Sequence, residues 1–371
     1  MVLYADRAFR DPSGRLAFRP VLNRLRLDSV KRLVNSVFHR RDAPSNPTAA
    51  HSTVVPGVWS WMIRVAKWLR ARDLEGSLAS ILREHEGHEL HVFIQHAHFS
   101  ELKLASRWRE PAVLHLVLRY SPELMPESPA ALSALLAGLG PNVRLYTDSE
   151  RLSAEYEKAG ARQVTTLPVP IQLPDKRNLQ RSAGVTVAFL GSSRVEKGFC
   201  ELPRLLERLS LPAAVQVTRD SADPRIRECV AELEALARRL PAGRLELLES
   251  PVPMETYYEW VERAGIVALP YLSRKYNAST SGIFVEALCF GVPVVCPAES
   301  WMSDVVEEAR KQNFRIGEIF SSLDDLPAAC QRVARDIDGY RKSVAAFAAQ
   351  WRRTHNADEC VRRLLEPVAH A

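Results

Sequence analysis

The chain has 371 residues, of which 46% are hydrophobic and 25% are charged, and these proportions exclude a disordered protein and predict two globular domains of ordinary size. No apolar run approaches the ~18 residues of a membrane-spanning helix, and the charged start MVLYADRAFRDPSGR does not fit an export signal. The net charge of +6 arises from residues 1–50, which hold ten Lys or Arg and four Asp or Glu. This surplus favours a phosphorylated substrate, an anionic lipid surface or nucleic acid; without a zinc finger or an aromatic RNA-binding pattern, we expect no nucleic acid.

Short β-branched runs alternate with amphipathic stretches along the first half of the chain. This alternation predicts an α/β fold with a mostly parallel sheet covered on both faces. We expect strands at 1–5, 53–55, 90–94, 112–118, 143–147 and 164–167, and helices at 58–71, 121–139 and 149–159.

A segment with three prolines, LPVPIQLPDKRNLQRSAG at 167–184, then interrupts the pattern and predicts a linker. A second series follows, with strands at 185–190, 214–218, 245–248, 266–269 and 292–296, and helices at 198–209, 224–240, 254–264, 281–290 and 303–311; residues 323–365 are nearly all helical. We therefore expect an N-terminal domain at 1–170, a linker at 171–184, a C-terminal domain at 185–345 and a C-terminal helix at 346–371.

The six cysteines form no C-x-x-C pair and lie mostly in apolar runs of the second half. This usage predicts buried, reduced thiols in a cytosolic protein, without a structural zinc site or a disulfide framework.

The first candidate site is the sequence GSSRVEKG at 191–198, which follows a predicted buried strand. Gly191 allows the backbone to turn tightly and to approach a ligand. Arg194 and Lys197 offer a planar set of donors and a point charge, both suited to a diphosphate. The alternative is that both are solvated loop cations.

The second candidate site is SGIFVEALCFGVPVV at 281–295, where a loop of small residues leads into a helix. The backbone N–H groups and the positive end of that helix suit an anion. Glu286 lies one turn further, in a helix with no other charge, and a carboxylate there needs partners such as the two hydroxyls of a ribose. The alternative is a structural Glu286 that caps a neighbouring loop.

In their order and separation, GSSRVEKG and SGIFVEALCFGVPVV resemble the C-terminal domain of GT-B glycosyltransferases of the family 4 (group 1) type, and the resemblance extends over residues 142–317. It implies two doubly wound Rossmann-like domains that face each other across a cleft, with a C-terminal helix that crosses back to the N-terminal domain. It also implies that Arg194 and Lys197 bind the donor diphosphate and that Glu286 holds the ribose. The backbone N–H groups that reach the distal phosphate would come from Ser281, Gly282 and Ile283.

The sequence departs from this family at one position near the transferred sugar. Many members have a second Glu eight residues before the first, where this chain has Ala278. Asn277 or Tyr276 would then face the sugar, so the donor sugar and the stereochemical outcome stay open.

The N-terminal half offers further candidates at the ends of predicted strands. Gly14 and Arg15 follow the first strand and resemble a loop that faces the donor phosphates, with an ordinary turn as the alternative. His96 and Arg119 follow two other strands, and together with Asn277 they are our candidate catalytic residues. His115 alternates into an apolar face, which predicts a core histidine.

The resemblance implies a retaining hexosyltransferase that moves a sugar from a nucleotide-diphosphate sugar to a saccharide or lipid-linked acceptor, in cell-surface polysaccharide or glycolipid synthesis. We expect no cofactor and no metal, because cations and helix dipoles can stabilise the leaving diphosphate. We also expect a cytoplasmic location and peripheral contact with an anionic membrane, through residues 1–50 and the Trp61/Trp68 helix. The alternatives are a non-catalytic binding subunit of the same architecture, which Ala278 favours, and a nucleotide-sugar epimerase.

Overall fold

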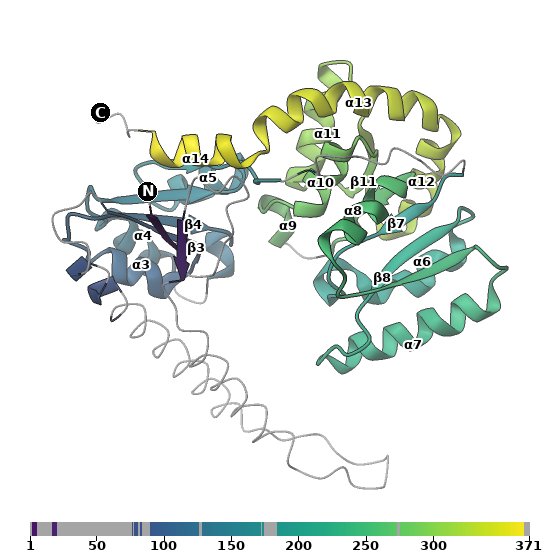
Figure 1. Ribbon diagram of the computed structural model, residues 1–371, viewed down its shortest axis with the longest axis horizontal. Coiled ribbons are helices and arrows are strands. Elements are labelled where there is room, and N and C mark those ends of the chain that lie inside the picture. The colour runs from purple at the N-terminus through teal and green to yellow at the C-terminus, as the bar shows by residue number, and fades with distance from the viewer. Residues whose placement is uncertain are drawn as a thin grey trace, which may run out of the picture. The chain divides into compact units, whose positions relative to one another are not determined.

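The computed structural model describes residues 2–5, 17–20, 76, 78–80, 82–83, 90–125, 128–171, 173, 184–272 and 275–366. The chain forms two compact units (Figure 1). Unit 1 comprises Met1–Thr147 and Ser153–Thr165, and unit 2 comprises Asp148–Leu152 and Thr166–Ala371. The predicted strand at 53–55, the helix at 58–71 and most of the linker at 171–184 lie outside the described residues.

Unit 1 is built on a six-stranded sheet with the order β2-β1-β3-β4-β5-β6. The strands are β1 (Val2–Ala5), β2 (Ala17–Pro20), β3 (His91–Ala97), β4 (Val113–Leu118), β5 (Val143–Thr147) and β6 (Val164–Thr166). Strands β2, β1, β3, β4 and β5 pair in parallel. Its helices include α3 (Phe99–Ala105), η1 (Pro122–Leu124), α4 (Pro129–Ala137) and α5 (Glu150–Lys158), which begins in the short segment assigned to unit 2.

Unit 2 has a second six-stranded sheet with the order β12-β11-β10-β7-β8-β9, in which all pairs are parallel. The strands are β7 (Val187–Phe189), β8 (Ala213–Val217), β9 (Leu245–Glu249), β10 (Ile266–Ala268), β11 (Val294–Pro297) and β12 (Gly317–Phe320). From β7 the chain adds strands toward one edge, and from β10 it adds them toward the other. The strand order therefore reverses between β7 and β10.

Helices cover both faces of this second sheet. The helices of this unit are η2 (Val195–Lys197), η3 (Phe199–Glu201), α6 (Leu202–Arg208), α7 (Pro224–Arg239), α8 (Met254–Arg263), α9 (Lys275–Ala278), α10 (Gly282–Phe290), α11 (Trp301–Lys311), η4 (Leu323–Asp325), α12 (Leu326–Arg335), α13 (Ile337–Thr354) and α14 (Ala357–Leu365). One hydrophobic cluster joins Ala188 and Leu190 to α8, α10, α11 and α13. A second cluster joins Val187 and Phe189 to α6, α7 and α12. Successive residues of one strand thus enter opposite cores, as the period of two predicts.

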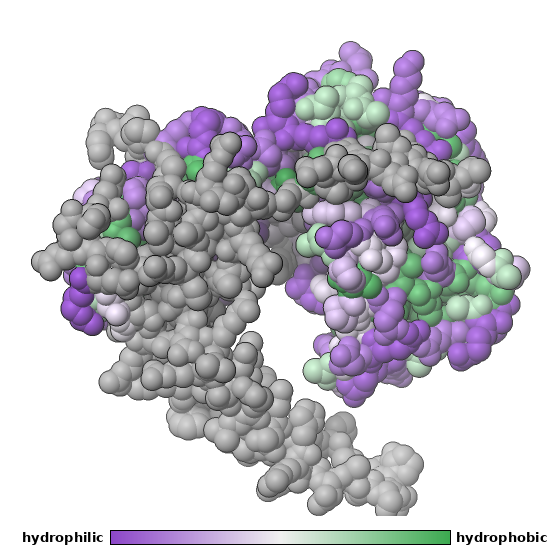
Figure 2. All heavy atoms as spheres, viewed as in Figure 1, coloured by the Kyte–Doolittle hydropathy of each residue, from purple (hydrophilic) through white to green (hydrophobic). Residues whose placement is uncertain are grey.

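Helix α7 illustrates how the sequence positions these layers. Ile226, Val230 and Leu233 are buried at helical spacing, while the charged residues between them face solvent. The surface over α7 is accordingly hydrophilic in Figure 2. Asp223 caps the helix, because its carboxylate accepts the Arg225 N–H at 3.0 Å.

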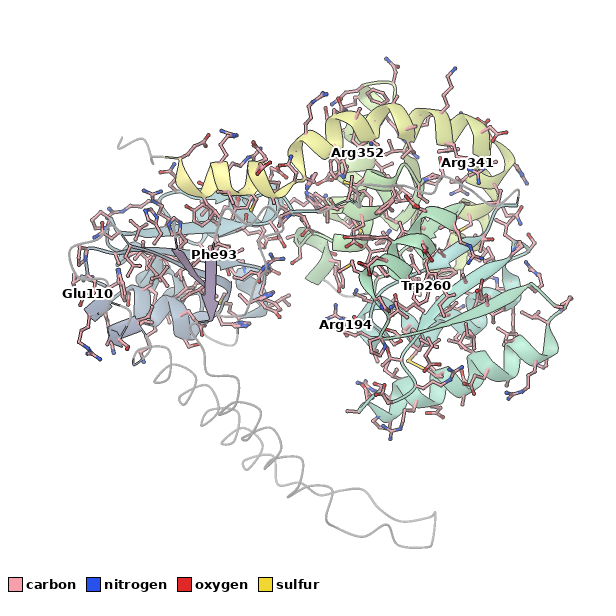
Figure 3. The ribbon with its side chains drawn as sticks, viewed as in Figure 1. Phe93, Glu110, Arg194, Trp260, Arg341 and Arg352 are labelled. Carbon is pink, nitrogen blue, oxygen red and sulfur yellow. A yellow bond between two sulfur atoms is a disulfide. The ribbon has the colours of Figure 1, made fainter. Side chains whose placement is uncertain are left out.

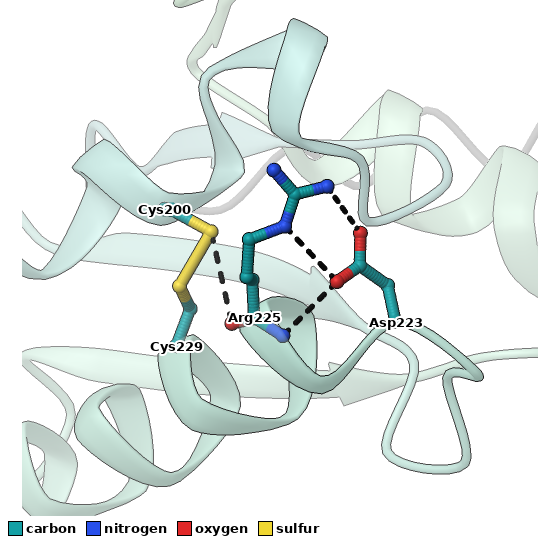
Figure 4. The surroundings of a disulfide bond; sticks show 4 residues. All are labelled: Cys200, Asp223, Arg225 and Cys229. Carbon is teal, nitrogen blue, oxygen red and sulfur yellow. Dashed lines mark hydrogen bonds and ion pairs between the residues drawn. A yellow bond between two sulfur atoms is a disulfide. The ribbon is translucent and has the colours of Figure 1, made fainter. Parts of the chain in front are cut away.

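A disulfide joins Cys200 of η3 to Cys229 of α7 (Figure 4). The expectation that all six cysteines are reduced is therefore wrong for this pair. The two residues are 29 positions apart, and only the packing of η3 on α7 brings them together. Cys289, Cys296 and Cys330 are buried thiols, as predicted.

The predicted α/β architecture is confirmed, with differences in single elements. The helix expected over 121–139 is interrupted and forms η1 and α4. Strands β2 and β12 and helices α3 and α9 were not predicted. The largely helical stretch at 323–365 is confirmed. Among the described residues, no helix is both long enough and apolar enough to cross a membrane.

Candidate functional site

The candidate site lies where the strand order of unit 2 reverses. Strands β7 and β10 are neighbours, and the two sequences singled out above follow their carboxyl ends. The loop after β7 and the loop after β10 lead away from each other, because the strand order reverses between these strands. Open α/β sheets bind ligands in the crevice that such a reversal leaves. The reversal thus gives a topological reason for the two sequences to meet.

Gly191 allows the first loop to approach the second. Its φ is +104°, and a Cβ added there would clash with Cδ1 of Ile283 and would lie 3.1 Å from Nζ of Lys197. Its N–H donates to Oε1 of Gln216 at 2.7 Å. Gly191 therefore lies directly against the first turn of α10 and against the Lys197 ammonium group.

Two cations extend from this loop. Lys197 places its ammonium group 5.6 Å from the centre of the Tyr271 ring. Arg194 (Figure 3) donates from Nη2 to the Tyr276 hydroxyl at 3.1 Å and forms an ion pair with Glu196 at 3.2 Å. Its buried Nε has no acceptor in the described part of the chain. An unpaired guanidinium N–H is costly, and an oxygen of an anionic ligand would satisfy it if the side chain turned.

The second loop ends in the N-terminus of α10. Ser281 caps the helix by accepting the Phe284 N–H at 3.3 Å, and its Oγ lies 3.0 Å from the hydroxyl oxygen of Tyr271. Gly282 is exposed, and a Cβ added to it would meet no atom within 4 Å. The positive end of α10 is therefore open to a ligand at Gly282 and lies beside Gly191 and Lys197 through Ile283.

Glu286 lies one turn into α10 and is largely buried. The Tyr257 hydroxyl donates to its Oε2 at 2.5 Å. Burial raises the pKa of Glu286, while the Tyr257 hydrogen bond and the Lys197 charge act in the opposite direction. Burial and the Glu286 charge also raise the pKa of Tyr257, which therefore remains a hydrogen-bond donor. Both the ribose role and a structural role remain compatible with these contacts.

Tyr276, Asn277 and Ala278, where the sequence departs from the family pattern, all belong to helix α9. Tyr276 is buried, packs against Tyr271 with the ring centres 4.2 Å apart and the planes tilted by 39°, and accepts the Arg194 hydrogen bond. Asn277 is exposed at the end of α9, and Ala278 is buried. Of the two residues proposed to face the sugar, Asn277 is the more accessible. Its catalytic role stays a prediction.

His96 and Arg119 belong to unit 1, at the carboxyl ends of two adjacent strands. Ala97 of β3 pairs with Leu118 of β4, so the two side chains arise at the same edge of the sheet. Nε of Arg119 donates to the Gln95 carbonyl at 3.3 Å. Whether they act together with the loops of unit 2 stays a prediction. Gly14 and Arg15 lie outside the described residues.

The prediction that His115 is a core histidine is confirmed. It is 2% exposed, and its two ring nitrogens lie 2.8 Å from Nδ1 of His91 and 2.9 Å from the Tyr146 hydroxyl. Burial, together with the nearby His91 and Arg144, lowers the pKa of His115 to about 3. His115 is therefore neutral at physiological pH.

Sequence reasoning missed Tyr257 and Tyr271, and it offered Tyr276 as a residue facing the sugar rather than as a partner of Arg194. Tyr257 comes from α8 and holds Glu286, while Tyr271 and Tyr276 hold Ser281 and Arg194. The tyrosines of PMETYYEWVERAGIVALPY were visible in the sequence, but no spacing rule indicates which of them reach the two loops.

Unit 2 also has a pocket of about 560 Å³ away from these loops. It lies between α11, α13 and the two segments 148–151 and 166–168. Its lining includes Trp301, Phe347, Trp351, Glu308 and Gln350. Trp301 and Phe347 are each only 5% exposed, so their ring faces are already packed. Across the described ranges, no group of three or more His, Cys, Asp or Glu could hold a metal ion.

Solved structures with the same architecture align over most of the chain. HepE from Anabaena, in complex with UDP-glucose, aligns over 98% of this chain and 97% of HepE with a TM-score of 0.60 and 14% identity. Trehalose-6-phosphate synthase, studied with bisubstrate glycomimetics for glycosyl transfer with retention, aligns over 98% of this chain and 92% of its own with a TM-score of 0.61 and 12% identity. Sucrose-phosphate synthase from Thermosynechococcus elongatus aligns over 80% of this chain and 76% of its own with a TM-score of 0.57 and 14% identity.

No protein-family model matches the sequence, and no curated protein is similar to it in sequence. The structural likeness therefore shows the fold. The GT-B fold that the two sequence patterns predicted is confirmed.

Proposed function

We propose that the protein is a glycosyltransferase that moves a sugar from a nucleotide-diphosphate sugar to a saccharide or lipid-linked acceptor, in cell-surface polysaccharide or glycolipid synthesis. One observation carries the proposal: Gly191, Lys197 and the N-terminus of α10 meet at the strand-order reversal of a GT-B fold, with Glu286 one turn away. A diphosphate and a ribose would match these groups.

The proposed chemistry is the departure of a diphosphate from the sugar. Negative charge grows on the leaving group, and Lys197, Arg194 and the N–H groups at Ser281, Gly282 and Ile283 would stabilise it. Glu286 would accept hydrogen bonds from the ribose hydroxyls and so orient the nucleotide. No cofactor is needed for this step, and the nucleotide sugar is a co-substrate.

The neighbours suggest which donor to test first. HepE was crystallised with UDP and with UDP-glucose, so a uridine nucleotide is the first candidate here. Trehalose-6-phosphate synthase was studied as an enzyme that transfers its sugar with retention, which supports our expectation of a retaining reaction. His96, Arg119 and Asn277 are the proposed groups near the acceptor and the transferred carbon.

A non-catalytic binding protein is the second candidate, and Ala278 favours it. This residue is 2% exposed and has no polar side chain, where many members of the family that the sequence resembles have a Glu. Such a protein would bind the nucleotide sugar as tightly as an enzyme but would not break its bond to the sugar.

Thermal shift and calorimetry with UDP, ADP and GDP, followed by donor hydrolysis, test both candidates. Ligand at about 100 times its Kd should stabilise the protein by ~2.7 kcal/mol. Binding with turnover supports the enzyme, and binding without turnover of any sugar nucleotide supports the binding protein. If none of the three diphosphates binds at millimolar concentration, both proposals fail.

A cytoplasmic location with peripheral membrane contact is a separate proposal. It rests on the charge of residues 1–50, and those residues and Trp61 and Trp68 lie outside the described structure, apart from β1 and β2. Sedimentation with anionic vesicles at low salt should exceed that with neutral vesicles and should fall with added salt. Equal sedimentation with both would end this proposal.

A further inference from the structure

The segment Asp148–Leu152 belongs to unit 2, although the chain on both sides of it belongs to unit 1. Its side chains bond to elements far along the sequence. Ser149 donates a hydrogen bond to the Ala278 carbonyl, and Glu150 accepts the Trp301 indole N–H at 3.4 Å. The segment is therefore anchored on α9 and α11.

Arg151 makes most of this anchor. Its guanidinium forms a bidentate pair with the Asp304 carboxylate, in which Nη2 lies 2.5 Å from Oδ1. Its Nη1 donates to two carbonyls, those of Asn277 at 3.0 Å and Glu299 at 2.9 Å. Glu299 has a φ of +56°, which residues other than glycine seldom adopt. One side chain thus joins α9, the turn after β11 and α11.

The bond to Asn277 leads to the candidate site. Asn277 and Ala278 end the four-residue helix α9, whose second residue is Tyr276. Tyr276 accepts the Arg194 hydrogen bond at 3.1 Å and packs against the Tyr271 ring. A four-residue helix has too few internal hydrogen bonds to hold its own place, so its position depends on partners such as Arg151.

We propose that Arg151 is a positioning residue of the candidate site: by holding α9 it fixes Tyr276, and through Tyr276 it fixes the guanidinium of Arg194. The nature of the ligand, a nucleoside diphosphate, rests on the proposed function. Arg151 bonds to the Asn277 carbonyl, and the neighbouring Tyr276 bonds to Arg194. Any effect of Arg151 on nucleotide binding should therefore pass through Tyr276.

Arg332 provides a matched control in the same unit. It pairs with Glu318 and Asp325 and has a side chain 42% exposed, against 36% for Arg151. Its partners lie on β12 and η4, and it makes no bond to α9. Arg332→Ala therefore removes a comparable ion-pair network without touching α9.

The first measurement is hydrogen–deuterium exchange over residues 275–282 in the full-length protein. Arg151→Ala should speed exchange there, because local opening becomes easier, while Arg332→Ala should not. Arg151→Lys should behave like Arg151→Ala, because the three donors on one ammonium nitrogen cannot replace four hydrogen bonds made from three separate guanidinium nitrogens. Unchanged exchange in Arg151→Ala would overturn the inference, whether or not a nucleotide binds.

The second measurement is UDP affinity in a double-mutant cycle with Tyr276→Phe. Arg151→Ala should weaken UDP binding roughly tenfold relative to Arg332→Ala, as a small displacement of a charged group can do. In the Tyr276→Phe background the Arg151→Ala change should have little further effect on UDP affinity, because the hydrogen bond between Tyr276 and Arg194 is already lost. The inference would be overturned if the losses of UDP affinity from Arg151→Ala and Tyr276→Phe were additive. It would also be overturned if Arg151→Ala and Arg332→Ala bound UDP equally well. Wild-type protein that binds no diphosphate would overturn the proposed function instead, and the exchange result would then decide the role of Arg151 alone.

Discussion

Arg194 and Lys197 lie on one loop but contact different residues. Arg194 bonds to Tyr276 and Glu196, whereas Lys197 lies over the Tyr271 ring and acts on Glu286. Either alanine variant should lower donor use by ~10²-fold or more, as removal of a charge-stabilising donor does. Arg239→Ala, which removes an exposed pair with Glu207, is the control. Steady-state kinetics with the donor and a melting curve for each variant provide the measurement. Unchanged turnover in both alanine variants would contradict our assignment of the site.

Loss of Lys197 should also alter Glu286. The ammonium group lowers the pKa of Glu286 against the effect of burial, so its removal should raise that pKa further. Lys197 is thus expected to serve both the diphosphate and the carboxylate beside it.

Glu286→Gln separates the two roles that remain open for this residue. If Glu286 binds the ribose, the variant should lose 10- to 100-fold in donor affinity, roughly the strength of a charge-assisted hydrogen bond, and should melt near the wild-type temperature. Calorimetry and thermal melting on the same sample decide the matter. A lowered melting temperature with unchanged affinity would indicate a structural residue.

The pH dependence of binding gives an independent check on Glu286. Its pKa lies above the ordinary value, so the carboxylate takes up a proton at a higher pH than an exposed Glu. Donor affinity should therefore fall as the pH falls through this raised pKa, because the protonated acid is a weaker acceptor. Glu286→Gln should remove that acid limb, and a limb that persists in the variant would belong to another group.

At the scale of elements, Gly198 joins η2 to η3 in a conformation that only glycine fits there. Its φ is +72°, and a Cβ would clash with the carbonyl oxygen of Pro270, which follows β10. Gly243 has a similar φ of +78° with no atom within 4 Å of an added Cβ. Gly243→Ala should cost about 1 kcal/mol of unfolding free energy, whereas Gly198→Ala should cost clearly more.

Chemical denaturation of these two variants provides the measurement. The difference between them isolates the contact with Pro270 from the backbone strain that both share. Equal losses of stability would show that the loop moves away from β10 without cost.

Much of the architecture could be predicted because the strands follow simple rules. The apolar run at 185–190 ends at Gly191, and the runs at 266–269 and 292–296 are each followed by a proline, Pro270 and Pro297. The elements that escaped prediction lack such signals. Strand β12, GEIF, includes a Gly and a Glu, and it is a strand because it pairs with β11. Helix α9 has four residues, too few for any periodicity.

The candidate site was partly predictable for a similar reason. Gly191, Lys197 and Ile283 follow from local sequence, and the strand-order reversal brings them together. Their supports, Tyr257, Tyr276 and Arg151, come from other elements, and only tertiary packing determines which side chain reaches which partner. The disulfide between Cys200 and Cys229 escaped prediction on the same ground.

At the scale of the whole molecule, each unit contains a buried neutral histidine. His115 in unit 1 has a pKa lowered to about 3, and burial lowers the pKa of His355 in unit 2 to about 4. Nδ1 of His355 accepts the Val169 N–H at 3.1 Å, which a protonated ring could not do.

Both histidines should make the protein sensitive to acid. A depressed pKa means that the unfolded chain binds the proton first, so the stabilisation is complete above the ordinary value of 6.5 and is lost as the pH falls toward the folded-state value. Each histidine should contribute a slope of about 1.4 kcal/mol per pH unit in that window. Denaturation between pH 7 and 4 should show a smaller slope for His355→Gln and for His115→Gln than for wild type. Identical slopes would contradict the burial of both rings.

The placement of Asp148–Leu152 has a consequence for recombination. This segment is encoded with the first half of the chain, but its Arg151 completes contacts with Asn277, Glu299 and Asp304 of the second half. A chimera that joins the first half of one parent to the second half of another at the 171–184 linker would separate the arginine from its partners. An exchange of donor specificity between parents should therefore need residues 148–152 to come from the same parent as the second half, grafted into the first half of the other parent.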